Sequence, residues 1–587
     1  MRQSKQFSFR AIIGCALVLF ALLAPRTAGF AAQETNLTFL NPVIWLLLHK
    51  SAHVPADAAQ ASRFLARSTF GPTLAGIDRL MKMGSYEAWL EDQFGQPPSF
   101  HLDWMRDRLP GIEWRTYCDL VHTAKRDGWW DIAVHGPDQL RQRVAFALSE
   151  IMVVSQYGPL INEPDGLASF YDVLVRNAFG NFRTLLEEVT LHPMMGKYLS
   201  YLGNAKADDP VAGSHPDENY AREVMQLFTI GLYRLNRDGT TINDPQTGLP
   251  LPTYNQADIR EMARIFTGWS DDNGGYFFVG EGDNTHHART SPMVSFPEHH
   301  DTGAKHILDT DFPAGQSAEQ DLKQALDLLF NHPNVGPFIA RRLIQRLVTS
   351  NPSPAYIERV AAAFNDNGHG VRGDMKAVIK AILLDPEALA GPEQDPHTFG
   401  KVREPLLCIS HLWRAFQAQN RECARRGEDE NSPVYHYNCF HFEAARSFLE
   451  QNAAHESLTV FNWFTPDDGP ADLKDLQLVS PERMVLGIDG LHSLLLSFIL
   501  ETYTYETYEV AAHLDVSAEI RDLERGDYDA MLDRLNLLLL GGTMDDGLRQ
   551  VLHDYIATNN GPDVDRDFLA RNIIALIFSS SQYAVQR

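Results

Sequence analysis

The chain has 587 residues, of which 44% are hydrophobic and 22% are charged, a composition typical of a globular protein. This composition excludes a disordered chain, and the aperiodic glycines and prolines exclude a collagen-like fibre. The 76 acidic residues outnumber the 51 basic residues and give a formal charge of −25. Because this charge repels phosphate backbones, we do not expect nucleic acid as a partner.

Residues 1–31 have the pattern of a secretory signal peptide. A basic segment ending at Arg10 precedes the uncharged, mostly apolar residues 11–24, and the small residues Gly29 and Ala31 suit a cleavage site. An uncleaved membrane anchor is the alternative, but a span needs about 20 apolar residues. We therefore expect an exported protein, periplasmic or extracellular, whose mature chain begins near Ala32 and has no transmembrane span.

Residues 32–61 are predicted to contain a short apolar helix and a linker. Asn41 and Pro42 suit the N-cap and first position of a helix over the apolar residues 43–48. Residues 55–61 are mostly small or polar, as in a linker. Residues 62–587 are then predicted to form one large helical domain.

Four cysteines lie beyond the predicted signal peptide. Cys423 and Cys439 flank the polar loop 424–438, and either a disulfide or two free thiols fit this arrangement. The other two are Cys118 and Cys408. No C-x-x-C motif occurs, so a cysteine zinc site is not expected.

Apolar residues recur at helical spacing from Ser62 onward. The clearest region predicts four helices, which begin at Ser317, Pro337, Ser353-Pro354 and Gly373-Asp374. The segment 231–304 breaks this pattern because it is rich in glycine and polar residues. There we predict one helix over 256–269 and short β pieces at 276–279 and 293–296. The fold class is therefore mainly α, a large multi-helix body with an irregular, partly β insertion-like segment.

Common catalytic motifs are absent from the sequence. There is no G-x-S-x-G elbow, no Walker A loop and no H-E-x-x-H pair. The usual serine hydrolase, nucleotide and zincin interpretations therefore have little support.

The strongest positive signal is a helix expected over residues 215–228, with Ser214 and Asp217 as a capping-box start. At 100° per residue, its apolar face consists of Tyr220, Val224, Leu227 and Phe228. Its polar face offers two carboxylates, a guanidinium and two amides, from Glu218, Asn219, Arg222, Glu223 and Gln226. This face could bind a metal, position water or hold a polar ligand. A solvated face with a Glu218–Arg222 pair is the alternative.

Two further polar groups lie in or near the irregular segment. The helix around residues 258–264 carries Asp258 and Arg264 opposite its apolar side. A histidine-rich run follows and includes His286, His287, His299, His300 and His306, with Asp301 adjacent. Imidazole and carboxylate together suit a divalent transition metal, whereas polar surface is the alternative interpretation.

At these residues the chain resembles the bacterial family called domain of unknown function 1800. The resemblance runs from about Ser62 to the C-terminus and rests on long motifs: 215–231, 258–264, 266–269, 300–305, 331–335, Arg403-Glu404-Pro405, 460–464 and 579–586. It implies a largely helical, exported bacterial protein without an established reaction. Genes of this family often adjoin those of a second uncharacterised family that resembles phosphatase-fold enzymes, which suggests an exported partner.

The positions carried over from the resemblance are Glu218, Asn219, Arg222, Glu223, Asp258, Arg264, Trp269, His300, Asp301 and Lys305. The metal candidates among them are Glu223, His300 and Asp301. This chain has Gln226 where family members often have glutamate. If that glutamate were a metal ligand, this protein would be impaired or different.

Three functions remain open at this point. The first is an exported binding or assembly protein that acts with a partner. The second is a carboxylate- or metal-dependent hydrolase-like enzyme, and the third is a structural envelope protein.

We predict that Glu218, Asn219, Arg222 and Glu223 face inward, toward the irregular segment. An enzyme would bring this face together with His300 and Asp301 in a cleft, whereas a binding protein would show a broad exposed apolar or charged patch. A buried charge on Glu223 must meet a cation, a metal or several donors. Arg264, Lys305 and His300 are the expected partners.

Overall fold

The computed structural model describes residues 53–109, 118–207, 215–272, 274–278, 289–391, 398–422, 438–439, 454–485 and 512–587. The chain divides into two units, Met1–Ser51 and Ala52–Arg587, and every described residue belongs to the second. The predicted signal peptide, the apolar helix 43–48 and Cys423 therefore lie outside the described residues. None of the described helices is long and apolar enough to cross a membrane.

The first third of the described chain consists of helices, as the apolar spacing predicts. Helix α3 begins at Ala58, inside the segment expected to be a linker, because Asp57 caps it by accepting from the N–H of Gln60. Thr73 and Ser85 cap the next two helices in the same way. The helices are α3 (Ala58–Ser68), α4 (Leu74–Met83), α5 (Tyr86–Phe94), α6 (His101–Arg108), α7 (Cys118–His135), α8 (Gln139–Ser149), α9 (Pro164–Asn177), α10 (Phe182–Thr190) and α11 (Pro193–Tyr198).

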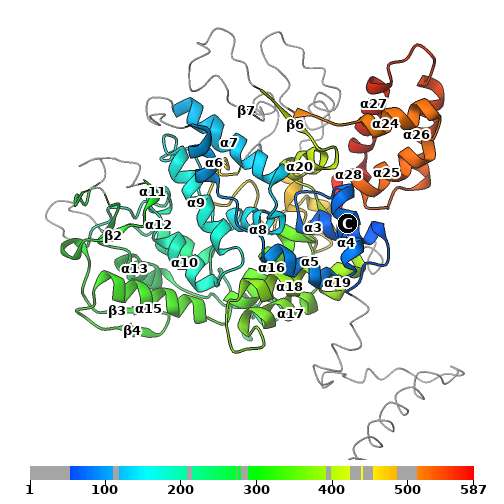
Figure 1. The fold of residues 1–587 in the computed structure, drawn as a ribbon. Coiled ribbons are helices and arrows are strands. Elements are labelled where there is room, and N and C mark those ends of the chain that lie inside the picture. Colours follow the sequence, from blue (N-terminus) through cyan, green and yellow to red (C-terminus); the bar gives the residue numbers. More distant parts are fainter. Residues whose placement is uncertain are drawn as a thin grey trace, which may run out of the picture. The chain divides into compact units, whose positions relative to one another are not determined.

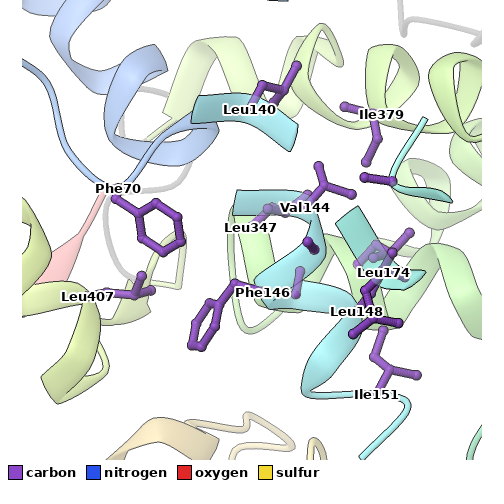
Figure 2. Close-up of a cluster of buried hydrophobic side chains, with 14 of the residues drawn as sticks. Phe70, Leu140, Val144, Phe146, Leu148, Ile151, Leu174, Leu347, Ile379 and Leu407 are labelled. Carbon is purple, nitrogen blue, oxygen red and sulfur yellow. The ribbon is translucent and has the colours of Figure 1, made fainter. Parts of the chain in front are cut away.

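Helix α8 lies at the centre of the hydrophobic core, since all of its residues are buried. Figure 2 shows Phe146 on the side of Phe70 and Leu407, whereas Leu148 lies on the opposite side with Leu174. Because Phe70 and Leu407 come from distant parts of the chain, the core joins its N-terminal and C-terminal halves.

The irregular segment contains little regular structure, as predicted, but its helix and strands differ from the expectation. Helix α13 (Gln256–Ile265) ends four residues early, and Trp269 lies in strand β1 (Trp269–Ser270). Gly268 causes this change: its φ is 77°, and a Cβ there would lie 2.9 Å from the carbonyl oxygen of Phe296. Strand β1 pairs with β2 (Val294–Ser295), so Trp269–Ser270, and not residues 276–279, is the partner of the predicted piece 293–296. A 3-10 turn, η1 (Pro297–His299), and the hairpin of β3 (Lys305–Ile307) with β4 (Thr310–Phe312) follow.

The four-helix region is confirmed, with one difference at its second helix. The helices are α15 (Ala318–Asn331), α16 (Val335–Leu347), α17 (Pro354–Asn365) and α18 (Met375–Leu383), followed by the short α19 (Pro386–Ala390). Ser317, Ser353 and Asp374 cap α15, α17 and α18 through their side chains. Helix α16 begins two residues before Pro337, which is compatible with proline in a first turn. Helices α16, α17 and α18 lie side by side in Figure 1.

The C-terminal part returns to the core through a short strand pair. Strand β5 (Lys401–Val402) pairs antiparallel with β9 (Val585–Gln586), which places the end of the chain beside helix α20 (Pro405–Ala415). Helices α24 to α27, orange to red in Figure 1, form a second group of packed helices. The remaining elements are β6 (Gln419–Glu422), β7 (Asn438–Cys439), α22 (Ala471–Lys474), η3 (Pro481–Met484), β8 (Ala512–His513), α24 (Ser517–Arg525), α25 (Tyr528–Leu540), α26 (Asp546–Asn559), α27 (Arg566–Phe578) and α28 (Ser581–Ala584).

Candidate functional site

Helix α12 (Asn219–Gln226) carries the polar face that the sequence singles out, but it starts later than predicted. Glu218 occupies its N-cap position without a side-chain cap, so the predicted capping box of Ser214 and Asp217 is wrong. The reason is Pro216, because the residue before a proline disfavours the helical conformation. Asp217 instead accepts a hydrogen bond of 2.8 Å from the N–H of Asn219.

The apolar face of α12 is packed as predicted. Tyr220, Val224 and Phe228 are completely buried, and Leu227 is partly buried. The ring of Tyr220 stacks on Tyr201 with centroids 4.1 Å apart, and its hydroxyl lies 2.6 Å from that of Thr190. This packing fixes the rotation of the helix about its axis and thereby fixes the direction of the polar face.

The polar face of α12 contacts the irregular segment, but the prediction that Glu218, Asn219, Arg222 and Glu223 all face away from solvent holds only for Glu223, because Asn219 is exposed and the other two are partly exposed. Gln256 donates to Glu218 over 2.7 Å, and the Tyr254 hydroxyl donates to Gln226 over 3.3 Å. Arg222 forms the i, i+4 pair with Glu218 at 3.4 Å, and both side chains are partly exposed. Asn219 is exposed and reaches only Ser200. Each of these four polar residues of α12 therefore forms a hydrogen bond or ion pair with a neighbouring polar side chain.

Glu223 is the exception on this face. The residue is only 6% exposed, and its Oε2 atom is buried without any hydrogen-bond donor among the described residues. Burial raises the pKa of Glu223, and the neighbouring Arg222 only partly offsets this effect. Burial, followed by the charge of Glu223, raises the pKa of the nearby Tyr198 to about 12. Glu223 is therefore a buried carboxyl group without the donors that would stabilise its charge.

The partners expected for Glu223 are engaged elsewhere, so that expectation is wrong. Arg264 binds Asp301 with two hydrogen bonds, Nε to Oδ2 at 2.8 Å and Nη2 to Oδ1 at 3.0 Å. Burial raises the pKa of Asp301, but the hydrogen bonds and charge of Arg264, the N–H of Gly303 and the charge of Lys305 together outweigh this and lower it. Asp258 completes a capping box with Asn255 and accepts from the N–H of Leu308.

His300 and Lys305 share one buried carboxylate, that of Asp321 in α15. The Nε2 atom of His300 lies 3.0 Å from Asp321 Oδ2, and Lys305 Nζ lies 2.6 Å from the same oxygen. The Nδ1 atom of His300 lies 2.9 Å from the carbonyl oxygen of Thr267. All three side chains are almost completely buried. This triad joins the 300–305 motif to α15.

The structure does not bring the proposed metal ligands together. The described residues contain no group of three or more His, Cys, Asp or Glu side chains that could hold a metal ion. Both ring nitrogens of His300 and both carboxylate oxygens of Asp301 already have partners. His299 stacks on Phe277 with centroids 3.9 Å apart, and the exposed His306 pairs with Asp311. His286 and His287 lie outside the described residues.

A second charged cluster escaped the sequence analysis. We call it the buried charge centre and define it as Glu150, Arg346, Lys401, Glu404 and Glu482, all of which are buried. Lys401 Nζ lies 3.1 Å from Glu404 and 3.3 Å from Glu482, and Arg346 lies 3.4 Å from Glu150. Burial raises the pKa of Glu150, although Arg346 opposes this.

Two of the resemblance motifs meet at the buried charge centre. Glu404 belongs to Arg403-Glu404-Pro405, and in the 460–464 motif Asn462 donates to Glu150 over 3.1 Å. The ring of Phe464 lies 4.6 Å from the guanidinium of Arg346. The signal that could have identified this cluster is the Arg403-Glu404 pair of charges inside a resemblance motif. Arg143 is a third cation near its carboxylates, and the cluster connects the end of α8, α16, residues 401–404 and η3.

Comparison with known proteins gives one match. The model of the family described as "Protein of unknown function (DUF1800)" matches residues 63–585. No curated protein and no solved structure matches the chain.

Proposed function

The chain belongs to the DUF1800 family of proteins of unknown function, and from its own residues we propose that it is an exported binding protein. The polar face of α12 is its binding site. There Glu223 accepts a hydrogen bond from a partner, and the neighbouring residues of α12 and of the irregular segment surround the contact.

The observation that carries this proposal is the unpartnered carboxyl group of Glu223. Leaving a buried polar group without a hydrogen bond costs about 1–3 kcal/mol, and more for a charged group. Buried polar groups that lack a hydrogen bond and so lower stability are typical of functional sites, where a bound partner provides the missing hydrogen bond. The residue as a whole is 6% exposed, so it lies just beneath the surface of this face.

The chemistry of the site favours a protonated amine as the bound group. A carboxylate needs a donor, and an ammonium group provides both donors and the opposite charge. The formal charge of −25 attracts cationic partners over a distance. A lysine side chain of a partner protein fits these requirements. The exported phosphatase-fold protein suggested by the family resemblance is the first such partner to test.

A hydrolase-like enzyme is the second candidate, and the raised pKa of Glu223 supports it. A raised pKa is the direction that a general acid needs. The described residues place no second carboxylate, histidine or nucleophile in hydrogen-bond contact with Glu223, so its acid–base chemistry would lack a local partner. The binding interpretation needs only the geometry observed.

The test is the affinity of the purified chain for an exported phosphatase-fold protein of the kind that the family resemblance suggests as a partner. We expect binding that Glu223→Gln weakens at least tenfold, because the amide loses the charge that pairs with the amine. Glu524→Gln, an exposed change on α24, is the matched control and should leave the affinity unchanged. Equal affinities for wild type and Glu223→Gln would refute the role of this face.

A further inference from the structure

A large cleft lies away from the α12 face. Its volume is about 1190 Å³, above the range of about 300–1,000 Å³ that is common for small-molecule pockets. Its walls come from the irregular segment around residues 238–243, from the turn at 350–354 before α17, and from residues 477–479. This volume is large enough for several units of a polymer. The walls that enclose it come from segments far apart in the sequence.

The charged side chains in the walls have partners within the protein. Arg341 pairs with Asp467 at 2.9 Å, and Asp238 accepts from both the N–H and the hydroxyl of Thr240. Glu387 accepts hydrogen bonds from the N–H and the hydroxyl of Ser353. Because the basic side chain of the walls is paired and the two carboxylates keep their charge, the cleft disfavours an anionic ligand.

Uncharged polar groups remain for a ligand. Thr241, Asn243 and Gln477 are exposed, and their side chains form no hydrogen bond with other described residues. Amides and hydroxyls both donate and accept, so the complementary ligand must do the same. The partly exposed Pro352 and Leu478 add apolar surface beside these groups.

Several backbone N–H groups in the walls are paired within the protein, which shortens the row of free groups that a peptide added as an extra strand would need. The N–H of Ser350 donates to Gly400, that of Leu478 to Leu473, and that of Val479 to the side chain of Asn351. A peptide bound as a strand needs a row of unpaired backbone groups. Side-chain amides and hydroxyls beside apolar surface suit sugar rings, which present hydroxyl edges and C–H faces.

We propose that this cleft binds an uncharged oligosaccharide. The site is independent of Glu223, so the α12 proposal and this one can fail separately.

The experiment titrates the purified full chain with cellohexaose, maltohexaose and chitohexaose by calorimetry. We expect at least one of them to bind, with an affinity that 0.5 M salt leaves unchanged because the sugars carry no charge. The double variant Asn243→Ala/Gln477→Ala should bind about tenfold more weakly, as expected for the loss of two hydrogen bonds. Gln550→Ala, an exposed glutamine on α26, and Glu223→Gln should bind like the wild type.

Three results would overturn the proposal. The first is that none of the three hexasaccharides binds. The second is binding that the double variant does not weaken, because the sugar would then lie elsewhere. The third is that an uncharged Gly-Ser peptide of similar length binds in the cleft while the sugars do not, which would assign the cleft to a polypeptide.

Discussion

Lys305 and Asp321 form an ion pair of 2.6 Å in which both side chains are shielded from solvent. Lys305 is the first residue of β3, and Asp321 lies in the first turn of α15. The ion pair therefore connects the β3–β4 hairpin to helix α15. His300 uses the same carboxylate oxygen. The polar motif 300–305 therefore supports the fold beside α13 and provides no donor to Glu223, whose Oε2 atom, like Asp321 Oδ1 and Trp269 Nε1, is buried without a hydrogen-bond partner among the described residues.

Replacing Asp321 with asparagine should strongly destabilise the protein. The change leaves Lys305 buried without its counter-charge, which costs about 3–5 kcal/mol. Urea unfolding, followed by circular dichroism, measures the loss. Asp78→Asn is the matched control, because its pair with Lys82 is exposed at 61% and 75% and should contribute about 0–1 kcal/mol. Equal effects of the two variants would contradict the account of this triad.

Glu223→Gln should not lower the free energy of unfolding at neutral pH, and it should raise it slightly. The wild-type carboxyl group has no donor to lose, and the amide removes the cost of burying a charge. This result would differ from that of a paired buried glutamate, whose removal costs about 3–5 kcal/mol.

The same variant should change how stability depends on pH. Because folding raises the pKa of Glu223 above 4.5, the protonated form favours the folded state. Its contribution is fully present below pH 4.5 and is lost as the pH rises through the folded pKa. The stability of Glu223→Gln relative to wild type should therefore increase between pH 4.5 and 7. A constant difference over this range would show that the pKa of Glu223 is not raised.

Lys401→Met should disrupt the buried charge centre. It removes the cation between Glu404 and Glu482, and leaving buried carboxylates unpaired costs about 3–5 kcal/mol. The loss should be smaller at pH 5 than at pH 8, because carboxyl groups without a cation have a raised pKa and are protonated more easily. Lys474→Met, whose pair with Asp468 is partly exposed, should cost less than about 1 kcal/mol.

Export makes a separate prediction for the N-terminus. The basic segment, the apolar core and the small residues before Ala32 predict cleavage near that position. Mass spectrometry of the native protein should find a mature chain that begins near Ala32. An intact chain that begins at Met1 or Arg2 would contradict export by a cleaved signal peptide.

Elements with local signals could be predicted from the sequence. The helix starts at Ser317, Ser353 and Asp374 depend on a side chain that caps the backbone within three residues, so a short window contains the information. The inward face of α12 follows from the spacing of Tyr220 and Val224 for the same reason.

The polar partners could not be predicted, because they depend on long-range packing. Arg264 and Asp301 are 37 positions apart, and Lys401 and Glu482 are still further apart, so no local spacing connects them. The start of β1 depended on Gly268, whose neighbour Phe296 becomes close only in the folded chain. These distant contacts decided which of the polar residues remained without a partner.

Zero-length carbodiimide cross-linking in intact cells tests the central claim most directly. This reagent joins a carboxylate to an amine only when the two groups are in contact. The account predicts a peptide containing Glu223 that is joined to a lysine of another protein, and its loss in Glu223→Gln but not in Glu524→Gln. Cross-links to partner lysines at exposed carboxylates of the same chain, with none at Glu223, would contradict the proposal that this residue binds a partner.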